Sequence, residues 1–345
     1  MPINPIDGFE VDPASLVSIG HDLQRPECIL AEADGTLWSA DARGGVVRIS
    51  PSGEQTLIVS GNAAPATAAE QFARIVNETL PNGMAFARTG DILIANFGTD
   101  RLELMKRSTG ESEVLYDNID GRPLGRVNFV LRDSRDRLWL TVSTRLADLT
   151  KSMTPSVRDG YIALADDNGI RIVADGLHFT NEIRFDAKEE WLYAVETCGM
   201  RVTRFRVATD GTLNGRETYG PDNHGRMIDG IAFDSFGNLW GTHIFTDRIF
   251  AITPDGDLRI ILDDDRDSEA GRQLLQAYAE ERLTPELMLA CGGTVAPWMA
   301  SITFGGSDLS NVYIGSLRGT TIPFFRSPVA GAPPVHWADQ RRELR

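Results

Sequence analysis

Cysteine is scarce in this sequence of 345 residues, and its distribution limits the chemistry that the chain can carry. The three cysteines, Cys28, Cys198 and Cys291, are too few and too widely spaced for a disulfide framework or a CxxC metal site. Cys28 and Cys198 fall in or near predicted inner strands, so we expect them to be buried thiols. This usage fits a reducing compartment, and we expect a cytoplasmic protein.

Positive charge is also in short supply. The chain has 34 Lys and Arg residues against 49 Asp and Glu residues, which gives a net charge of −15. Because binding to a phosphate backbone needs a basic surface, this composition argues against nucleic acid as a partner. An acidic surface favours solubility and attracts cations, although it can equally be no more than a solvated surface.

Long apolar runs and targeting patterns are missing as well. No stretch of about 18 apolar residues occurs, so we expect no membrane-spanning helix and no membrane partner. Residues 1–8 lack a basic region followed by an apolar run, so we expect no secretory signal.

Several familiar catalytic motifs do not occur either. The chain contains no GxSxG, HExxH, GxGxxG or phosphate-binding loop. The acidic run at residues 263–267 lacks the glycine and the position-twelve glutamate of an EF-hand, and we interpret it as a solvated loop. Any function must therefore come from another arrangement of residues.

The sequence does contain an internal repeat. Each copy has a polar residue, an apolar strand, a turn rich in Gly, Asn or Asp, and a second strand that opens on a large apolar residue. The copies begin 46 to 72 residues apart, the interval of one four-stranded propeller blade with a variable loop. The six copies are residues 27–38, 82–93, 128–139, 181–193, 229–240 and 301–313.

We therefore predict an all-β fold, a six-bladed β-propeller in which residues 1–345 form a single domain. The strand-like run at residues 16–19 is expected to add an outer strand to the last blade and so close the ring. The proline-containing tail from Ser327 is expected to be irregular. The blades start near residues 27, 82, 128, 181, 229 and 301.

Three long segments interrupt the repeat, at residues 61–80, 144–158 and 263–300. Strand alternation returns all three to the face where the inner strands begin, and the last has helical spacing. We interpret them as lid-like insertions around the channel mouth, because loops on a rigid scaffold commonly carry specificity. The alternative is that they are ordinary insertions without substrate contact.

The first strand of each blade lines the axis, so the polar residues that head the repeats converge on one end of the channel. Four of them offer two carboxylates and two amide oxygens, which suit a hard divalent cation. We predict one bound dication, Ca²⁺ first, with Mg²⁺, Mn²⁺ and Zn²⁺ as alternatives. The competing interpretation is that these residues only cap turns. The predicted metal ligands are Glu27, Asn128, Asn181 and Asp229.

The motifs around these residues resemble those of the SMP-30/gluconolactonase/luciferin-regenerating family, over roughly residues 22–325. The resemblance implies a six-bladed propeller with a central dication, held by a glutamate of the first blade, a middle-blade asparagine and the aspartate of a D-G-hydrophobic motif. These roles fall on Glu27 in PECIL, Asn181 in TNEIRF and Asp229 in IDGIAFD. An Arg-x-Asn motif of the family, associated with substrate or metal contact, matches residues 126–128.

The resemblance also implies hydrolysis of lactones, a small-molecule substrate class. A cation can polarise the carbonyl oxygen while water attacks, and Asp229 is the implied base, with metal-activated water as an equal alternative. Two other functions stay open: a non-enzymatic propeller that binds a small molecule or partner around a structural metal, and a metal-dependent enzyme of another reaction type. The oligomeric state is not predicted. The candidate substrate-binding residues are Arg126, Asn82, His178, His224 and His243.

Overall fold

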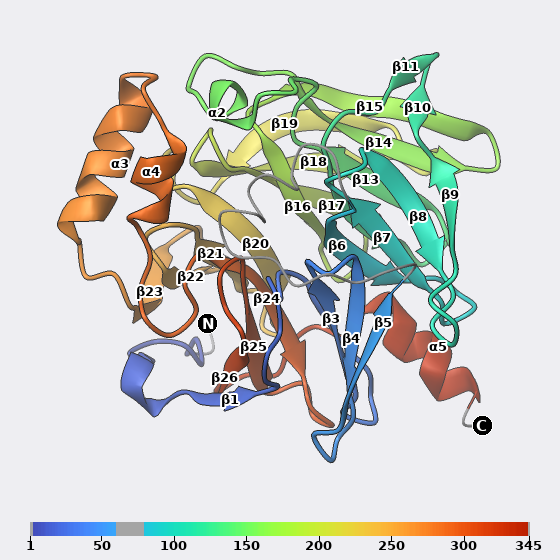
Figure 1. Ribbon diagram of the computed structural model, residues 1–345, viewed down its shortest axis with the longest axis horizontal. Helices are drawn as coiled ribbons and strands as arrows, with labels where there is room; N and C mark the ends of the chain where they lie inside the picture. Colours follow the sequence, from blue (N-terminus) through green and yellow to red (C-terminus); the bar gives the residue numbers. More distant parts are fainter. Residues whose placement is uncertain (1–2, 60–78, 344–345) are drawn as a thin grey trace.

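The computed structural model describes residues 3–59 and 79–343, which form the predicted six-bladed β-propeller (Figure 1). Each blade is a four-stranded antiparallel sheet, and the inner strands of neighbouring blades pack against each other around the ring. The inner strands are β2 (Ile29–Ala31), β6 (Pro81–Phe86), β12 (Val127–Arg132), β16 (Thr180–Phe185), β20 (Ile228–Phe233) and β24 (Met299–Gly305). The second strands are β3 (Leu37–Asp41), β7 (Ile92–Asn96), β13 (Leu138–Val142), β17 (Trp191–Glu196), β21 (Leu239–His243) and β25 (Asn311–Ser316).

The two outer positions of each blade follow in chain order, except in the sixth blade. The third strands are β4 (Gly45–Ile49), β8 (Arg101–Met105), β14 (Gly160–Asp166), β18 (Arg201–Val207), β22 (Arg248–Ile252) and β26 (Ile322–Arg326). The outer strands are β5 (Gln55–Val59), β9 (Ser112–Tyr116), β15 (Gly169–Leu177), β19 (Leu213–Tyr219), β23 (Leu258–Asp263) and, in the sixth blade, β1 (Val17–Ile19).

Strand β1 closes the ring, as the sequence predicts. It pairs antiparallel with β26, with Val17 opposite Phe324 and Ile19 opposite Ile322. The sixth blade therefore combines one strand from the start of the chain with three from its end, and its outer edge is covered.

Three blades share a buried tryptophan at the second position of their second strand. Trp38, Trp139 and Trp240 are at most 1% exposed. Each indole N–H needs a partner once buried, and each finds a carboxylate at the end of the preceding strand. The three pairs are Trp38 with Glu32 at 2.6 Å, Trp139 with Asp133 at 3.0 Å and Trp240 with Asp234 at 2.8 Å.

The insertion between the fifth and sixth blades is helical, as expected. Helix α3 (Glu269–Ala279) is capped by Ser268, and α4 (Pro285–Leu289) by Thr284. The 144–158 insertion carries the short helix α2 (Leu149–Ser152), and the insertion at 61–80 lies almost entirely outside the described residues. Smaller elements are a 3₁₀ helix, η1 (Pro13–Ser15), and a hairpin of β10 (Asn118–Ile119) and β11 (Arg122–Pro123).

The C-terminal tail contains a helix, so the prediction of an irregular tail was wrong. Helix α5 (Val335–Glu343) starts directly after Pro334 and covers the end of the ring opposite α3 and α4 (Figure 1). Trp337 is 2% exposed, and its indole donates to the Ala31 carbonyl at 3.1 Å. Tertiary contacts of this kind stabilise a helix that local pattern does not reveal. No helix of the described residues is both long and apolar enough to cross a bilayer.

Candidate metal centre

The polar residues that head the repeats lie at irregularities of the inner strands. Five inner strands shift register against their second strand near their first residues. A β-bulge of this kind re-aims side chains, and it recurs in each of these blades at the repeat position. The residues at the shifts are Asn82, Asn128, Asn181, Asp229 and Ser301.

Glycines after two of these residues let neighbouring strands approach closely. A Cβ on Gly83 would lie 2.6 Å from Cα of Phe129, and one on Gly230 would lie 2.4 Å from the Ala300 carbonyl oxygen. The fourth blade has Glu182 at the equivalent position, and its Oε2 accepts a hydrogen bond from the Ile231 amide at 3.2 Å. Glu182 is thereby a third buried carboxylate beside Glu27 and Asp229.

Polar contacts connect the sixth, first, second and third blades around the channel. Arg25 donates to Oδ1 of Asn82 at 2.7 Å, and its Nη1 lies 2.8 Å from Oε2 of Glu27. The Asn82 amide donates to the Asn128 carbonyl at 3.0 Å, and Ser301 donates to the Glu27 carbonyl. Both ends of the Asn82 amide are therefore engaged by protein.

The amide oxygens of Asn128 and Asn181 lack protein partners. Both Oδ1 atoms are buried and accept no hydrogen bond within the described chain. On the other side of its amide, Asn181 donates to the Thr197 hydroxyl at 3.1 Å, which fixes the amide orientation. Buried acceptors that lack a hydrogen-bond partner are rare in native proteins, because burying such an oxygen costs free energy.

The carboxylates of the channel are strained electrostatically. Burial raises the pKa of Glu27 to about 7 although Arg25 opposes the shift, and Glu182 raises it further. Burial also raises the pKa of Asp229 well above its usual value, with added repulsion from Glu27 and Glu182. Three buried carboxylates face two guanidinium groups, since Arg184 pairs with Glu182 at 2.8 Å. An added positive charge in the channel would therefore reduce the repulsion between these carboxylates.

This donor set fits a hard cation. Two carboxylates and two unpartnered amide oxygens are oxygen ligands of the kind that Ca²⁺ accepts. In residues 3–59 and 79–343, no three His, Cys, Asp or Glu side chains are grouped to hold an ion. A metal at this place would therefore depend on Asn128 and Asn181 as well as on Glu27 and Asp229.

The other predicted contact residues are engaged elsewhere. Arg126 is buried, and its guanidinium donates to the carbonyls of Phe97 at 3.4 Å and Ala147 at 3.1 Å and pairs with Asp100 at 3.3 Å. It thus connects the second blade to the 144–158 insertion. His178 lies 2.9 Å from Oε2 of Glu196, on the second strand of blade four.

His224 and His243 form a pair in the fifth blade. His224 Nδ1 lies 3.1 Å from His243 Nε2, and the His243 ring stacks on Phe250 with centroids 4.5 Å apart. Burial lowers the pKa of His224 to about 4, and burial together with the neighbouring His224 lowers the pKa of His243 well below its usual range. Within the described residues, none of the three histidines hydrogen-bonds to the four candidate ligands.

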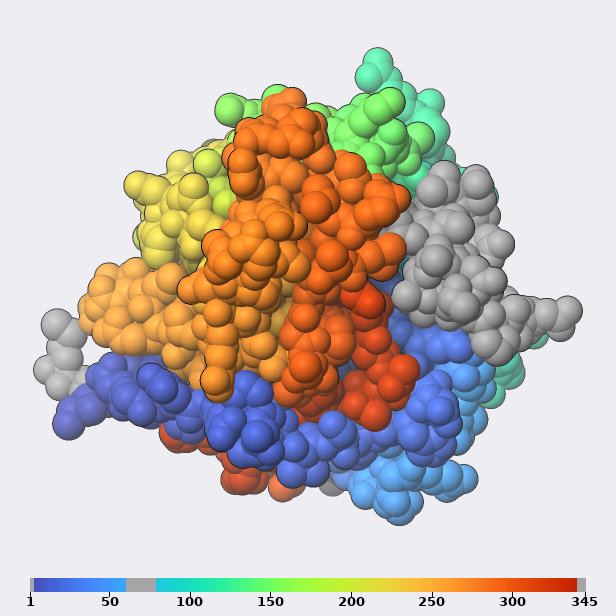
Figure 2. All heavy atoms as spheres, turned by 60° about the vertical axis from the view of Figure 1, so that its left-hand side comes forward, coloured from blue at the N-terminus to red at the C-terminus, as the bar shows by residue number. Residues whose placement is uncertain are grey.

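A buried apolar cluster covers the face where the inner strands begin; we call it the lid cluster. Helices α3 and α4 lie across the middle of this face (Figure 2). They contribute side chains that meet residues just before inner strands and one residue of the 144–158 insertion. The main members are Met153, Phe179, Met227, Phe245, Leu274, Tyr278, Met288 and Trp298.

The sequence did not predict a role in the channel for two residues, Arg25 and Glu182. Arg25 precedes the repeat and turns inward from a left-handed backbone (φ 57°), which a repeat pattern does not reveal. Glu182 stands where the repeats of the second and fifth blades have Gly83 and Gly230, and that difference was the available signal.

The six blades and the oxygen donors that converge at one end of the channel place the protein among the β-propellers with a polar site in the central channel. The model of the SMP-30/gluconolactonase/LRE-like region matches residues 62–263, and the chain belongs to this family. No functionally curated protein matches this sequence.

Solved structures of three proteins share the fold at low identity. A gluconolactonase from Xanthomonas campestris is 16% identical, with TM-score 0.64, covering 90% of this chain and 88% of its own. A luciferin-regenerating enzyme is 14% identical, with TM-score 0.67 and coverage of 93% and 99%. The calcium-binding protein regucalcin from Agrobacterium tumefaciens is 17% identical, with TM-score 0.62 and coverage of 91% and 95%.

Proposed function

We propose that the protein is a divalent-metal-dependent hydrolase of a small cyclic ester, a lactonase. The observation that carries the proposal is the pair of unpartnered amide oxygens, Asn128 Oδ1 and Asn181 Oδ1, beside mutually repelling carboxylates. Family membership and the gluconolactonase and regucalcin likenesses support it. Ca²⁺ is the proposed ion, because the donors are all oxygen.

Different residues of the chain would have different roles in such a reaction. Glu27, Asn128, Asn181 and Asp229 would hold the ion, whose positive charge polarises an ester carbonyl and stabilises the developing oxyanion. Asp229 is the proposed catalytic residue, because its carboxylate can accept a proton from the attacking water. Thr197 orients the amide of Asn181, and Arg25 pairs with Glu27, whose oxygen the ion would have to share with this arginine.

The lid cluster supports an apolar substrate. Three of its members, Phe179, Met227 and Trp298, directly precede inner strands, and Met and aromatic side chains bind apolar groups and adapt to their shape. Sugar hydroxyls would remain without partners against this surface. We therefore propose a lactone with an apolar body, whose ester reaches the polar end of the channel.

The test measures hydrolysis of matched panels of apolar lactones and aldonolactones through the acid that hydrolysis releases. Protein from which a chelator has removed the metal should be inactive, and its activity should recover when Ca²⁺ is added. Mg²⁺, Mn²⁺ and Zn²⁺ are added in parallel for comparison. Asp229→Ala should abolish turnover, while Asp257→Ala, an exposed blade-five control, should not.

One outcome would favour a second candidate, a binding propeller with a structural cation. The buried lid cluster is the observation behind it, since it covers the channel end. If the folded, metal-loaded protein hydrolyses no lactone of either panel, the lactonase proposal fails and the binding function takes its place.

A further inference from the structure

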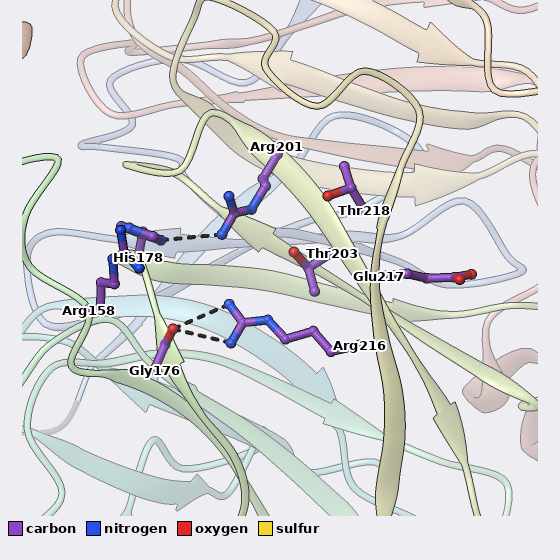
Figure 3. Close-up of a pocket in the computed structure, with 8 residues that line it drawn as sticks. All are labelled: Arg158, Gly176, His178, Arg201, Thr203, Arg216, Glu217 and Thr218. Carbon is purple, nitrogen blue, oxygen red and sulfur yellow. Dashed lines mark hydrogen bonds between the residues drawn. The ribbon is translucent and has the colours of Figure 1, made fainter.

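A pocket of about 340 Å³ lies beside the fourth blade, and none of its lining residues is a predicted metal ligand (Figure 3). Its walls come from the end of the 144–158 insertion, from β15 and the residue after it, and from β18 and β19. Three arginines and a histidine face it, in a protein whose net charge is −15. They are Arg158, Arg201, Arg216 and His178.

A buried carboxylate organises two of these arginines. Glu196 is fully buried; Nε and Nη2 of Arg201 donate to its two oxygens at 3.0 Å each, and Arg216 Nη2 donates at 3.2 and 3.3 Å. Arg216 also donates to the Gly176 carbonyl at 3.2 Å. The guanidinium groups are thereby held in place before any ligand arrives, which lowers the entropy cost of binding.

The positive charge of the pocket exceeds its negative charge. Glu196 balances one of three guanidinium groups, and Glu217 pairs with Arg204, outside the pocket, at 2.7 Å. Arg158 is exposed and makes no hydrogen bond or ion pair with any other residue that the structure describes. Two positive charges therefore remain for a ligand.

His178 is oriented to add a polar contact. Its Nδ1 lies 2.9 Å from Oε2 of Glu196, which can only accept, so Nδ1–H donates there. Nε2 of the neutral ring is then an acceptor for a protonated ligand oxygen, such as the hydroxyl of hydrogen phosphate. Thr203 and Thr218 supply hydroxyl groups in the same wall. Arginine forks and hydroxyls match oxyanions in geometry as well as in charge.

We propose that this pocket is a binding site for a small, multiply charged oxyanion, a phosphate or a dicarboxylate group. A volume of about 340 Å³ suits a small molecule rather than a protein segment. The site goes beyond the proposed lactonase activity and shares none of the proposed metal ligands; His178, predicted from the sequence as a substrate contact of the channel, lines this pocket.

Calorimetric titration of the full chain with inorganic phosphate and, separately, with malonate tests the proposal. It is run in zwitterionic buffer without added divalent cation, with sodium chloride at equal ionic strength as reference. At least one of the two anions should bind saturably. Arg158→Gln should weaken that binding about tenfold. The melting temperature of this variant without ligand should match the wild type, because Arg158 has no partner to lose among the residues that the structure describes.

Two controls separate this site from others. Arg326→Gln removes the same charge from an exposed blade-six position and should leave the affinity unchanged. Asp229→Asn should also bind the anion as the wild type does, because the channel is not involved. Binding of phosphate alone or malonate alone would identify the anion group. The proposal fails if neither anion binds saturably, if Arg158→Gln binds equally well, or if Asp229→Asn abolishes binding.

Discussion

The side-chain amide of Asn181 donates to the Thr197 hydroxyl at 3.1 Å, and this bond leaves Oδ1 of Asn181 without a protein partner. The amide of a candidate ligand is thus held by a residue on the loop between β17 and β18. The same loop donates from Cys198 to the His178 carbonyl and accepts from Tyr278 of α3. It connects the channel, the blade-four pocket and the lid.

Thr197→Val should weaken Ca²⁺ binding about 10- to 100-fold, the usual cost of removing a residue that orients a ligand. Without the hydroxyl, the Asn181 amide loses one of the contacts that orient it; its contact with Asp229 remains. Calorimetry on chelated protein measures the change, and Thr212→Val, at an exposed turn, is the control. Equal affinities for the two variants would show that Thr197 does not position the ligand.

Arg25→Gln should tighten Ca²⁺ binding about tenfold. The Arg25 guanidinium lies 2.8 Å from Glu27, so it repels a dication and competes for the same oxygen. Glutamine keeps a donor for Asn82 but carries no charge. Weaker binding by this variant would mean that Arg25 assembles the site rather than competing with the ion.

Asp229→Asn should abolish lactone turnover and yet stabilise the metal-free protein by about 1–2 kcal/mol. Burial and repulsion from Glu27 disfavour the Asp229 carboxylate, and an amide removes this cost. Asp234→Asn is the matched opposite: Asp234 accepts from three backbone amides and Trp240, so we expect about 1–3 kcal/mol of destabilisation. Urea unfolding measures both. Destabilisation of the metal-free protein by Asp229→Asn would contradict the electrostatic argument.

The share of the free energy of unfolding that the neutral His224 contributes should be lost as the pH drops from about 6.5 to about 4. Burial lowers the pKa of His224 from 6.5 to about 4, so in this window the unfolded chain binds a proton that the folded chain does not. This single histidine contributes about 3 kcal/mol to the loss. Urea unfolding of the wild type and of His224→Asn at several pH values should show that the stability of the wild type relative to the variant falls across this window. The exposed His21→Asn should decline as the wild type does.

Local features explain why the blades were predictable. Turns such as Asp34-Gly35 and buried tryptophans such as Trp240 recur at fixed distances, and both act within one hairpin. Pairing of β1 with β26 followed from the need to cover a sheet edge.

Long-range contacts explain what was missed. Helix α5 follows a proline-containing stretch, and its docking rests on the Trp337 contact with Ala31, about 300 residues away. Arg25 reaches Asn82 through a left-handed backbone that arginine rarely adopts. The functional roles of Asn82, Arg126 and the histidines stay predictions; their contacts with other parts of the protein could be seen only in three dimensions.

Closure of the ring by β1 and β26 has a consequence for biosynthesis. The ribosome makes Ile19 early and its partner Ile322 about 300 residues later. At roughly 5–20 residues per second, the first strand waits on the order of 15 to 60 s for its sheet. The earlier blades can form during translation, but the last cannot, so the nascent chain is an open ring with an unpaired edge until β26 has been synthesised.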